Sequence, residues 1–199
     1  MLVDHAFAVP MALLWGRSRR VKTIPIAVNT VQFPLPSPAR CYKLGNAIGR
    51  AIDSYDEDVR VVIVGTGGLS HQLDGERAGF INKEFDLMCL DKIVSDPEVL
   101  TRYSTLDLVR LSGAQGVELL MWLVMRGALT GDVSEIHSNY HVPVSNTASA
   151  VIVLENTSLP QKSAANSPHS AEWSDSSNSF RFALQSLSLR ERAGREAAG

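Results

Sequence analysis

The chain has 199 residues, of which 45% are hydrophobic and 20% are charged, and its formal net charge is −2. This composition is typical of a globular protein, with room for one core of roughly 100–200 residues. Nineteen basic residues against twenty-one acidic ones exclude the electropositive surface that binding to nucleic acid or to an anionic membrane requires. The chain contains no run of about eighteen apolar residues, so no transmembrane helix is expected.

The N-terminus and the cysteines indicate a cellular compartment. The first residues, MLVDH, lack the basic segment and the apolar stretch of a signal peptide. The two cysteines, Cys41 and Cys89, are too few for a disulfide framework or a zinc site. We therefore expect a cytoplasmic, reducing location.

Segments with strand and helix patterns alternate over the first 155 residues. Short β-branched runs predict buried strands, and apolar residues at helical spacing predict the helices. The expected elements are a strand over 21–28, a helix over 39–55, a strand over 60–64, helices over 84–93, 97–102 and 116–129, and a strand over 148–154. This order predicts the α/β fold class, with a sheet covered by helices.

The composition changes near residue 156. Ten of the thirty-three residues from 156 to 188 are serine, and such a stretch buries too little apolar surface to offset its ordering entropy. We therefore predict a domain over 1–155 and a disordered or loosely attached tail over 156–199. His169 falls in this tail, where it is expected to be solvated.

A glycine-rich turn, GTGGLSH over 65–71, follows the second predicted strand. Open α/β sheets bind ligands at such strand ends. The turn is not a dinucleotide fingerprint, because Ser70 occupies the position of the third glycine. It also has neither the lysine of a P-loop nor the frame of a nucleophile elbow. Two interpretations remain open: a turn that presents Ser70 and His71 to a ligand, or a plain turn with an incidental histidine.

Few other residues are candidates for chemistry. His137 and His141, at i and i+4, could bracket a metal on a helix, but the neighbouring sequence favours a loop or strand. Glu118 lies in an otherwise apolar helical pattern, and a carboxylate is rarely buried there unless it is paired or binds a metal. The alternative is that Glu118 belongs to a single polar stripe that touches water at the helix ends. By count alone, His5, His71 and Glu118 would make a facial triad for non-haem Fe(II).

Several longer stretches resemble a known enzyme family. They are VIVGTGGLSHQL over 62–73, DGERAGFIN over 74–82, NTVQFPLP over 29–36, GVELLMW over 116–122 and YHVPVSNTA over 140–148. In order and approximate spacing they resemble the class III extradiol ring-cleavage dioxygenases. Within that family they are most similar to the catalytic β subunit of protocatechuate 4,5-dioxygenase and the related gallate dioxygenases. The resemblance extends over about residues 2–155.

The resemblance implies a role for each candidate residue. Glu118 corresponds to the carboxylate ligand of the active-site Fe(II), and His71 to a histidine that acts as acid and base on the substrate. His5 corresponds to a histidine that lines the pocket and hydrogen-bonds the substrate. Ser145 and Asn146 correspond to the loop that approaches the substrate's carboxylate. These roles replace the counted triad, because only Glu118 would then be a ligand.

The resemblance also implies what the chain lacks. The family's two iron-binding histidines lie upstream of the stretch that matches Leu2, so we expect a C-terminal portion without the N-terminal strands of the domain. The implied activity is Fe(II)- and O₂-dependent cleavage of catecholic acids such as protocatechuate or gallate. The implied assembly is a homodimer or a complex with a small α subunit. The alternative is a truncated, non-catalytic fragment that keeps only a subunit-binding surface.

Overall fold

The computed structural model describes residues 4–16, 21–30, 32–57, 59–129, 131–157 and 181–185. The helices are α1 His5–Trp15, α2 Pro38–Asp53, α3 Lys83–Ser95, α4 Pro97–Thr101, α5 Thr105–Ser112 and α6 Leu119–Ala128, with the 3-10 turn η1 Gly116–Glu118 before α6. The strands are β1 Val133–His141, β2 Ser149–Asn156 and β3 Arg181–Gln185. They form an antiparallel sheet in the order β1-β2-β3.

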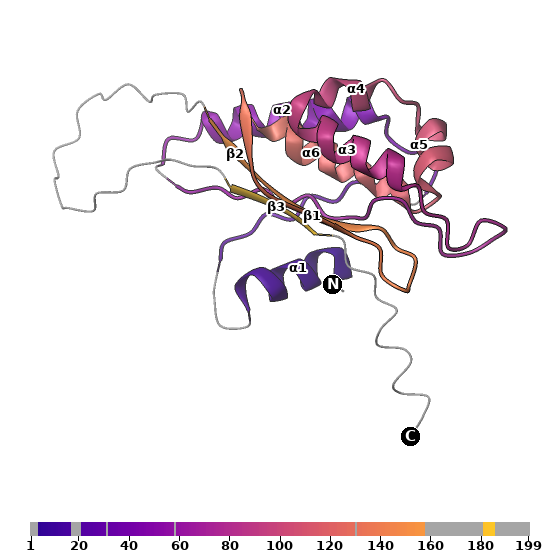
Figure 1. Cartoon of the computed structure of the whole chain (residues 1–199). Coiled ribbons are helices and arrows are strands. Elements are labelled where there is room, and N and C mark those ends of the chain that lie inside the picture. Colours follow the sequence, from indigo (N-terminus) through magenta and orange to yellow (C-terminus); the bar gives the residue numbers. More distant parts are fainter. Residues whose placement is uncertain are drawn as a thin grey trace, which may run out of the picture.

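The sheet carries helices on both faces. Helices α2 to α6 gather on one face, and α1 lies on the other (Figure 1). The predicted α/β class, a sheet covered by helices, is therefore confirmed. The central strand β2 alternates between buried and half-buried residues, so one of its faces points into the core. Ile152 and Leu154 on that face are fully buried in the same cluster as Trp122 of α6.

Helices α2 and α6 approach each other closely because α2 presents a glycine to the neighbouring backbone. A Cβ atom at Gly45 would overlap the carbonyl oxygen of Val124 and lie 2.8 Å from the Cα of Gly127. Only a residue without a side chain permits this approach. The contact fixes α6, and with it Glu118, which immediately precedes that helix.

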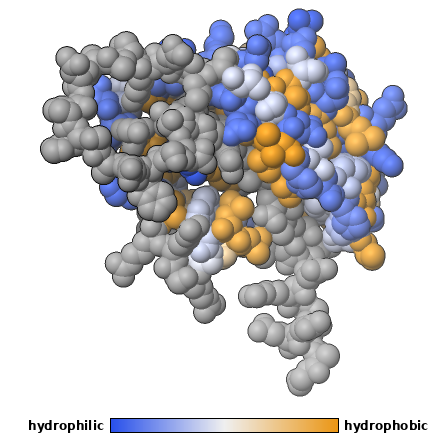
Figure 2. Space-filling model, turned by 60° about the vertical axis from the view of Figure 1, so that its left-hand side comes forward, coloured by the Kyte–Doolittle hydropathy of each residue, from blue (hydrophilic) through white to orange (hydrophobic). Residues whose placement is uncertain are grey.

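Two of the predicted strands were wrong. Residues 21–28 and 60–64 form neither strand nor helix. Their β-branched pattern predicts burial, but a strand also needs a neighbouring backbone to bond with, and neither segment has a ladder partner among the described residues. Their apolar side chains reach the surface: Ile24 is 88% exposed and Ile26 is 52% exposed. Figure 2 shows apolar residues at the surface among polar ones.

The other predicted elements are confirmed to within a few residues at each end, and four further elements, α1, α5, β1 and β3, were not predicted. Helix α1 carries a proline inside it, and α5 is only eight residues long. Strand β1 is largely exposed, so its sequence does not need the alternation of apolar and polar residues from which a strand is predicted. These are elements whose local sequence signals are weak.

The predicted tail over 156–199 contains the end of β2 and all of β3. Residues 158–180 and 186–199, including His169, lie outside the described residues, so the tail remains a prediction. None of the helices in the described ranges combines the length and the hydrophobicity that a membrane-spanning segment needs.

Candidate active site

The glycine-rich turn holds Glu118. The backbone N–H of Gly68 donates to Oε2 of Glu118 at 2.8 Å, and the indole N–H of Trp122 donates to the carbonyl of Gly67 at 3.3 Å. Gly67 has φ +113°, and a Cβ atom there would lie 2.6 Å from the Cβ of Glu118. The turn therefore needs glycine both for its backbone conformation and for the close approach of Glu118.

His71 lies at the other end of the same turn. Its side chain is buried, and Nδ1 lies 2.8 Å from the carbonyl oxygen of Leu69. Because a carbonyl can only accept, Nδ1 carries the proton in the neutral ring and Nε2 keeps its lone pair. The backbone N–H of His71 donates to the carbonyl of Ser112 at 2.8 Å, which fixes the chain at this point.

Gly68 joins the two candidate residues. Its N–H bonds Glu118, and a Cβ atom on it would lie 2.9 Å from Cε1 of the His71 ring. The glycines are thus required where Glu118 and His71 pack against the turn. The choice between a ligand-presenting turn and a plain turn stays a prediction.

The segment with Ser145 and Asn146 lies beside His71. The two residues occupy the turn after β1, where Asn146 adopts φ +53° and its N–H donates to the carbonyl of Pro143 at 2.9 Å. The next residue, Thr147, pairs with His71 in an isolated antiparallel bridge. The structure therefore brings Ser145 and Asn146 to the same end of the molecule as His71 and Glu118.

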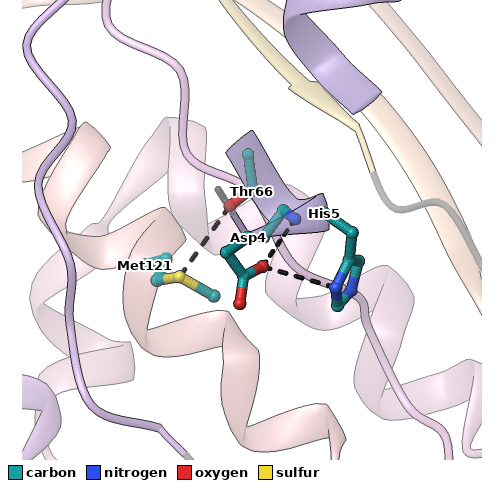
Figure 3. Close-up of polar contacts among 5 residues, drawn as sticks. Asp4, His5, Thr66 and Met121 are labelled. Carbon is teal, nitrogen blue, oxygen red and sulfur yellow. Dashed lines mark hydrogen bonds and ion pairs between the residues drawn. The ribbon is translucent and has the colours of Figure 1, made fainter. Parts of the chain in front are cut away.

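His5 is placed differently from the other candidates. It is the first residue of α1, its side chain is 62% exposed, and its Nδ1 lies 3.3 Å from Oδ1 of Asp4. Figure 3 draws Asp4 and His5 with Thr66 and Met121, and the His5 ring lies on the side of Asp4 away from Met121. Among the described residues, no three His, Cys, Asp or Glu side chains are grouped so that they could hold a metal ion. The triad counted from His5, His71 and Glu118 is therefore not formed.

The pair His137 and His141 does not form a metal site. Both residues lie on β1 and both are exposed. Four residues along a strand span about 13 Å, which is too far for two imidazoles to share one ion. The preference for loop or strand over helix at this position is confirmed.

Sequence reasoning missed Asp86, a fully buried carboxylate on α3. It accepts hydrogen bonds from Ser70, the neighbour of His71, and from Tyr140 of β1. The sequence contained a signal for this burial. Leu90 and Ile93 follow Asp86 at four and seven positions, so Asp86 lies on the apolar face of its helix. Like Glu118, Asp86 is a carboxylate in an apolar helical pattern, and such a group is rarely buried unless it is paired or binds a metal.

A separate cleft of about 440 Å³ lies between α2, α4 and the end of α6. It is lined by Tyr42, Asn46 and Arg50 of α2 and by Arg126 of α6, among others. The guanidinium of Arg126 donates to the carbonyl of Ile93 at 2.8 Å, which caps the end of α3. None of the candidate residues lines this cleft, so it is not part of the site described above.

Comparison with known proteins identifies the family. Residues 1–153 match the family described as the catalytic LigB subunit of aromatic ring-opening dioxygenase, and the chain belongs to this family. The resemblance read from the GTGGLSHQL stretch is therefore confirmed.

Individual relatives agree with the family. Over 169 residues the chain is 43% identical to gallate dioxygenase of Pseudomonas putida, covering 84% of this chain and 49% of that protein. Over 72 residues it is 46% identical to a 2,3-dihydroxyphenylpropionate/2,3-dihydroxicinnamic acid 1,2-dioxygenase of Klebsiella pneumoniae, covering 36% of this chain and 22% of that protein. A relative of the same description from Rhodococcus jostii is 48% identical over 71 residues. The chain spans about half the length of the gallate dioxygenase and about a fifth of the other two.

Proposed function

We propose that this chain is the part of an extradiol ring-cleaving dioxygenase that contributes Glu118 and His71 to the active site. The observation that carries the proposal is the turn at Gly68, which contacts both residues. Family membership and the similarity to gallate dioxygenase support the same reaction class. The proposed substrates are O₂ and a catecholic acid such as gallate or protocatechuate, in the breakdown of aromatic compounds.

His71 is the proposed acid and base. With its Nδ1–H held by Leu69, the ring offers Nε2 as a proton acceptor, and Nε2 can later return the proton. Burial keeps the ring in one place, which a proton transfer over hydrogen-bond distance requires. Ser145 and Asn146, in the turn that leads to Thr147, are proposed to hold the substrate's carboxylate, and His5 to line the pocket.

Glu118 is the proposed carboxylate ligand of an Fe(II) ion. Gly68 occupies one of its oxygens, and a carboxylate has a second oxygen with which to bind a metal. Non-haem Fe(II) sites of this type use two histidines with one carboxylate, and the described residues do not supply such a group. The described residues therefore do not form an iron site by themselves.

The proposed assembly supplies the metal ligands that the described residues of this chain do not provide. A homodimer or a complex with a small α subunit fits the exposed apolar residues of segment 21–28. Cys41 and Cys89 are both free and buried, in keeping with the proposed cytoplasmic location.

A second candidate function follows from the same observations. A chain that lacks a complete set of metal ligands among its described residues could act as a non-catalytic fragment that keeps a subunit-binding surface. The two candidates differ in one measurable property, which is iron retained by the folded chain.

The test is anaerobic Fe(II) loading of the full 199-residue chain, with iron measured after desalting and ring cleavage assayed with gallate and protocatechuate. If the proposed assembly completes the iron site, iron should be retained by the wild type and by Glu84→Gln, an exposed carboxylate on α3, and affinity should fall more than about 100-fold in Glu118→Gln. His71→Ala should keep iron and lose turnover by about 10²–10⁴-fold. Equal iron in Glu118→Gln would overturn the ligand assignment, and no iron in a folded wild type would favour the non-catalytic fragment.

A further inference from the structure

Asp86 is a buried carboxylate surrounded by hydrogen-bond donors. Its Oδ1 accepts from the backbone N–H of Ser70 at 2.8 Å, and its Oδ2 accepts from the Ser70 hydroxyl at 2.6 Å and the Tyr140 hydroxyl at 2.9 Å. Neither of the ion pairs found among the described residues involves Asp86. Burial raises the pKa of Asp86, and the bonds from Ser70 and Tyr140 oppose that rise.

Ser70 is held at every polar atom. Its N–H and hydroxyl donate to Asp86, its Oγ also accepts from the N–H of Asn82 at 2.8 Å, and its carbonyl accepts from the N–H of Ala148 at 3.1 Å. The hydroxyl hydrogen therefore has one available direction, toward Asp86. Because His71 is the next residue, its backbone position is set by this arrangement.

We propose that Asp86 is a positioning residue for His71: by holding the N–H and hydroxyl of Ser70, it fixes the backbone from which the imidazole projects and so keeps Nδ1–H on the Leu69 carbonyl. The inference rests on the proposed role of His71 as acid and base, because only that role requires Nε2 to stay unprotonated in the neutral ring. Asp86 touches neither the substrate nor the reacting atoms in this arrangement.

A carboxylate suits this task better than an amide. Asp86 accepts three hydrogen bonds and donates none, whereas asparagine would offer one acceptor oxygen and an NH₂ group. In Asp86→Asn, at least one donor of Ser70 or Tyr140 would face that NH₂ group. The turn would then lose a constraint next to His71, while Tyr140→Phe would leave both bonds from Ser70 in place.

The experiment is NMR of the imidazole nitrogens of His71 in the full chain, at alkaline pH where imidazoles are neutral. The wild type and Tyr140→Phe should show a protonated Nδ1 and an unprotonated Nε2. In Asp86→Asn both nitrogen resonances should shift toward each other, because the two tautomers become mixed. Asp107→Asn, which alters the capping box of α5, serves as the matched control and should leave the His71 resonances unchanged.

The inference is overturned by a wild-type His71 protonated at Nε2, or by an unchanged single tautomer in a folded Asp86→Asn chain. Circular dichroism establishes folding, and Ser70→Ala replaces Asp86→Asn if the latter does not fold. Ser70→Ala removes the hydroxyl's bond to Asp86 and its bond from the N–H of Asn82, and it keeps the backbone N–H bond to Asp86. An unchanged tautomer in Ser70→Ala would then overturn the inference. The NMR measurement needs neither iron nor turnover. If Asp86→Asn mixes the two tautomers but the wild type shows no ring cleavage, the result counts against the proposed function alone and leaves the role of Asp86 standing.

Discussion

Replacing Gly67 with alanine tests whether the glycine turn is built around Glu118. A Cβ atom at this position would lie 2.6 Å from the Cβ of Glu118 and 3.0 Å from both its carbonyl oxygen and the Cε of Met121. The Glu118 Cβ is the stem of the side chain, so it cannot move aside without moving the backbone of η1. We expect Gly67→Ala to displace Glu118 and break its bond to the N–H of Gly68.

The expected cost has two parts. A residue with a side chain at φ +113° is strained by about 1–3 kcal/mol. Crowding against Glu118 and Met121 adds about 1–3 kcal/mol, the usual cost of overpacking. The sum, near 4 kcal/mol, corresponds to a fall in Tm of about 8–16 °C for a protein of this size.

Gly75→Ala is the matched control. Gly75 also has a positive φ, +74°, but the nearest atom to its Cβ would be the amide nitrogen of Gln72 at 3.7 Å. Gly75→Ala should therefore lose only about 1–2 kcal/mol of stability, from the backbone strain of a residue with a side chain at positive φ. Thermal unfolding followed by circular dichroism measures both variants, and the amide resonance of Gly68 reports on its bond to Glu118. A Gly67→Ala variant no less stable than Gly75→Ala, or an unshifted Gly68 amide, would show that Glu118 does not pack closely against Gly67.

Two further predictions concern stability. Gly45→Ala should destabilise the chain, because overpacking against the backbone of α6 costs about 1–3 kcal/mol and outweighs the helix propensity of about 1 kcal/mol that alanine gains over glycine. Urea unfolding measures the sign of the change. Ala47→Gly, at an exposed position of α2, is the control for helix propensity. A stabilised Gly45→Ala would contradict the close packing of α2 on α6. The second prediction concerns Asp86, whose pKa burial raises in the folded state above the unfolded value of about 4. The contribution of Asp86 to the free energy of unfolding is therefore greatest below about pH 4, and it declines as the pH rises through the raised pKa. The difference in unfolding free energy between the wild type and Asp86→Asn should therefore shrink from acid toward neutral pH, and a difference that grows over this range would show the opposite shift.

Much of the helical structure could be predicted locally. Helix α2 has Pro38 in its first turn and the side chain of Ser37 as its cap, and both signals are readable in the sequence. Glu118 could be singled out because a charge interrupts an apolar helix, and the GTGGLSH stretch because glycines follow an apolar run. In each case the physical cause lies within a few residues of the effect.

Strand formation and residue contacts depend on distant parts of the chain. Residues 21–28 and 60–64 have the side chains of strands but no described ladder partner, while the exposed β1 forms a strand because β2 pairs with it. Pairing is a property of two segments, so the pattern of one cannot decide it.

The sequence by itself determined the family, the helices with clear caps, and the identity of Glu118 and His71 as chemically unusual residues. Only the tertiary structure decided that Gly68 contacts both of them, that Thr147 pairs with His71, and that Asp86 holds Ser70. The reason is physical: periodicity and capping act between residues a few positions apart, whereas these contacts join α3, η1 and the turn after β1 to one loop. Such contacts exist only once the core has brought those elements together.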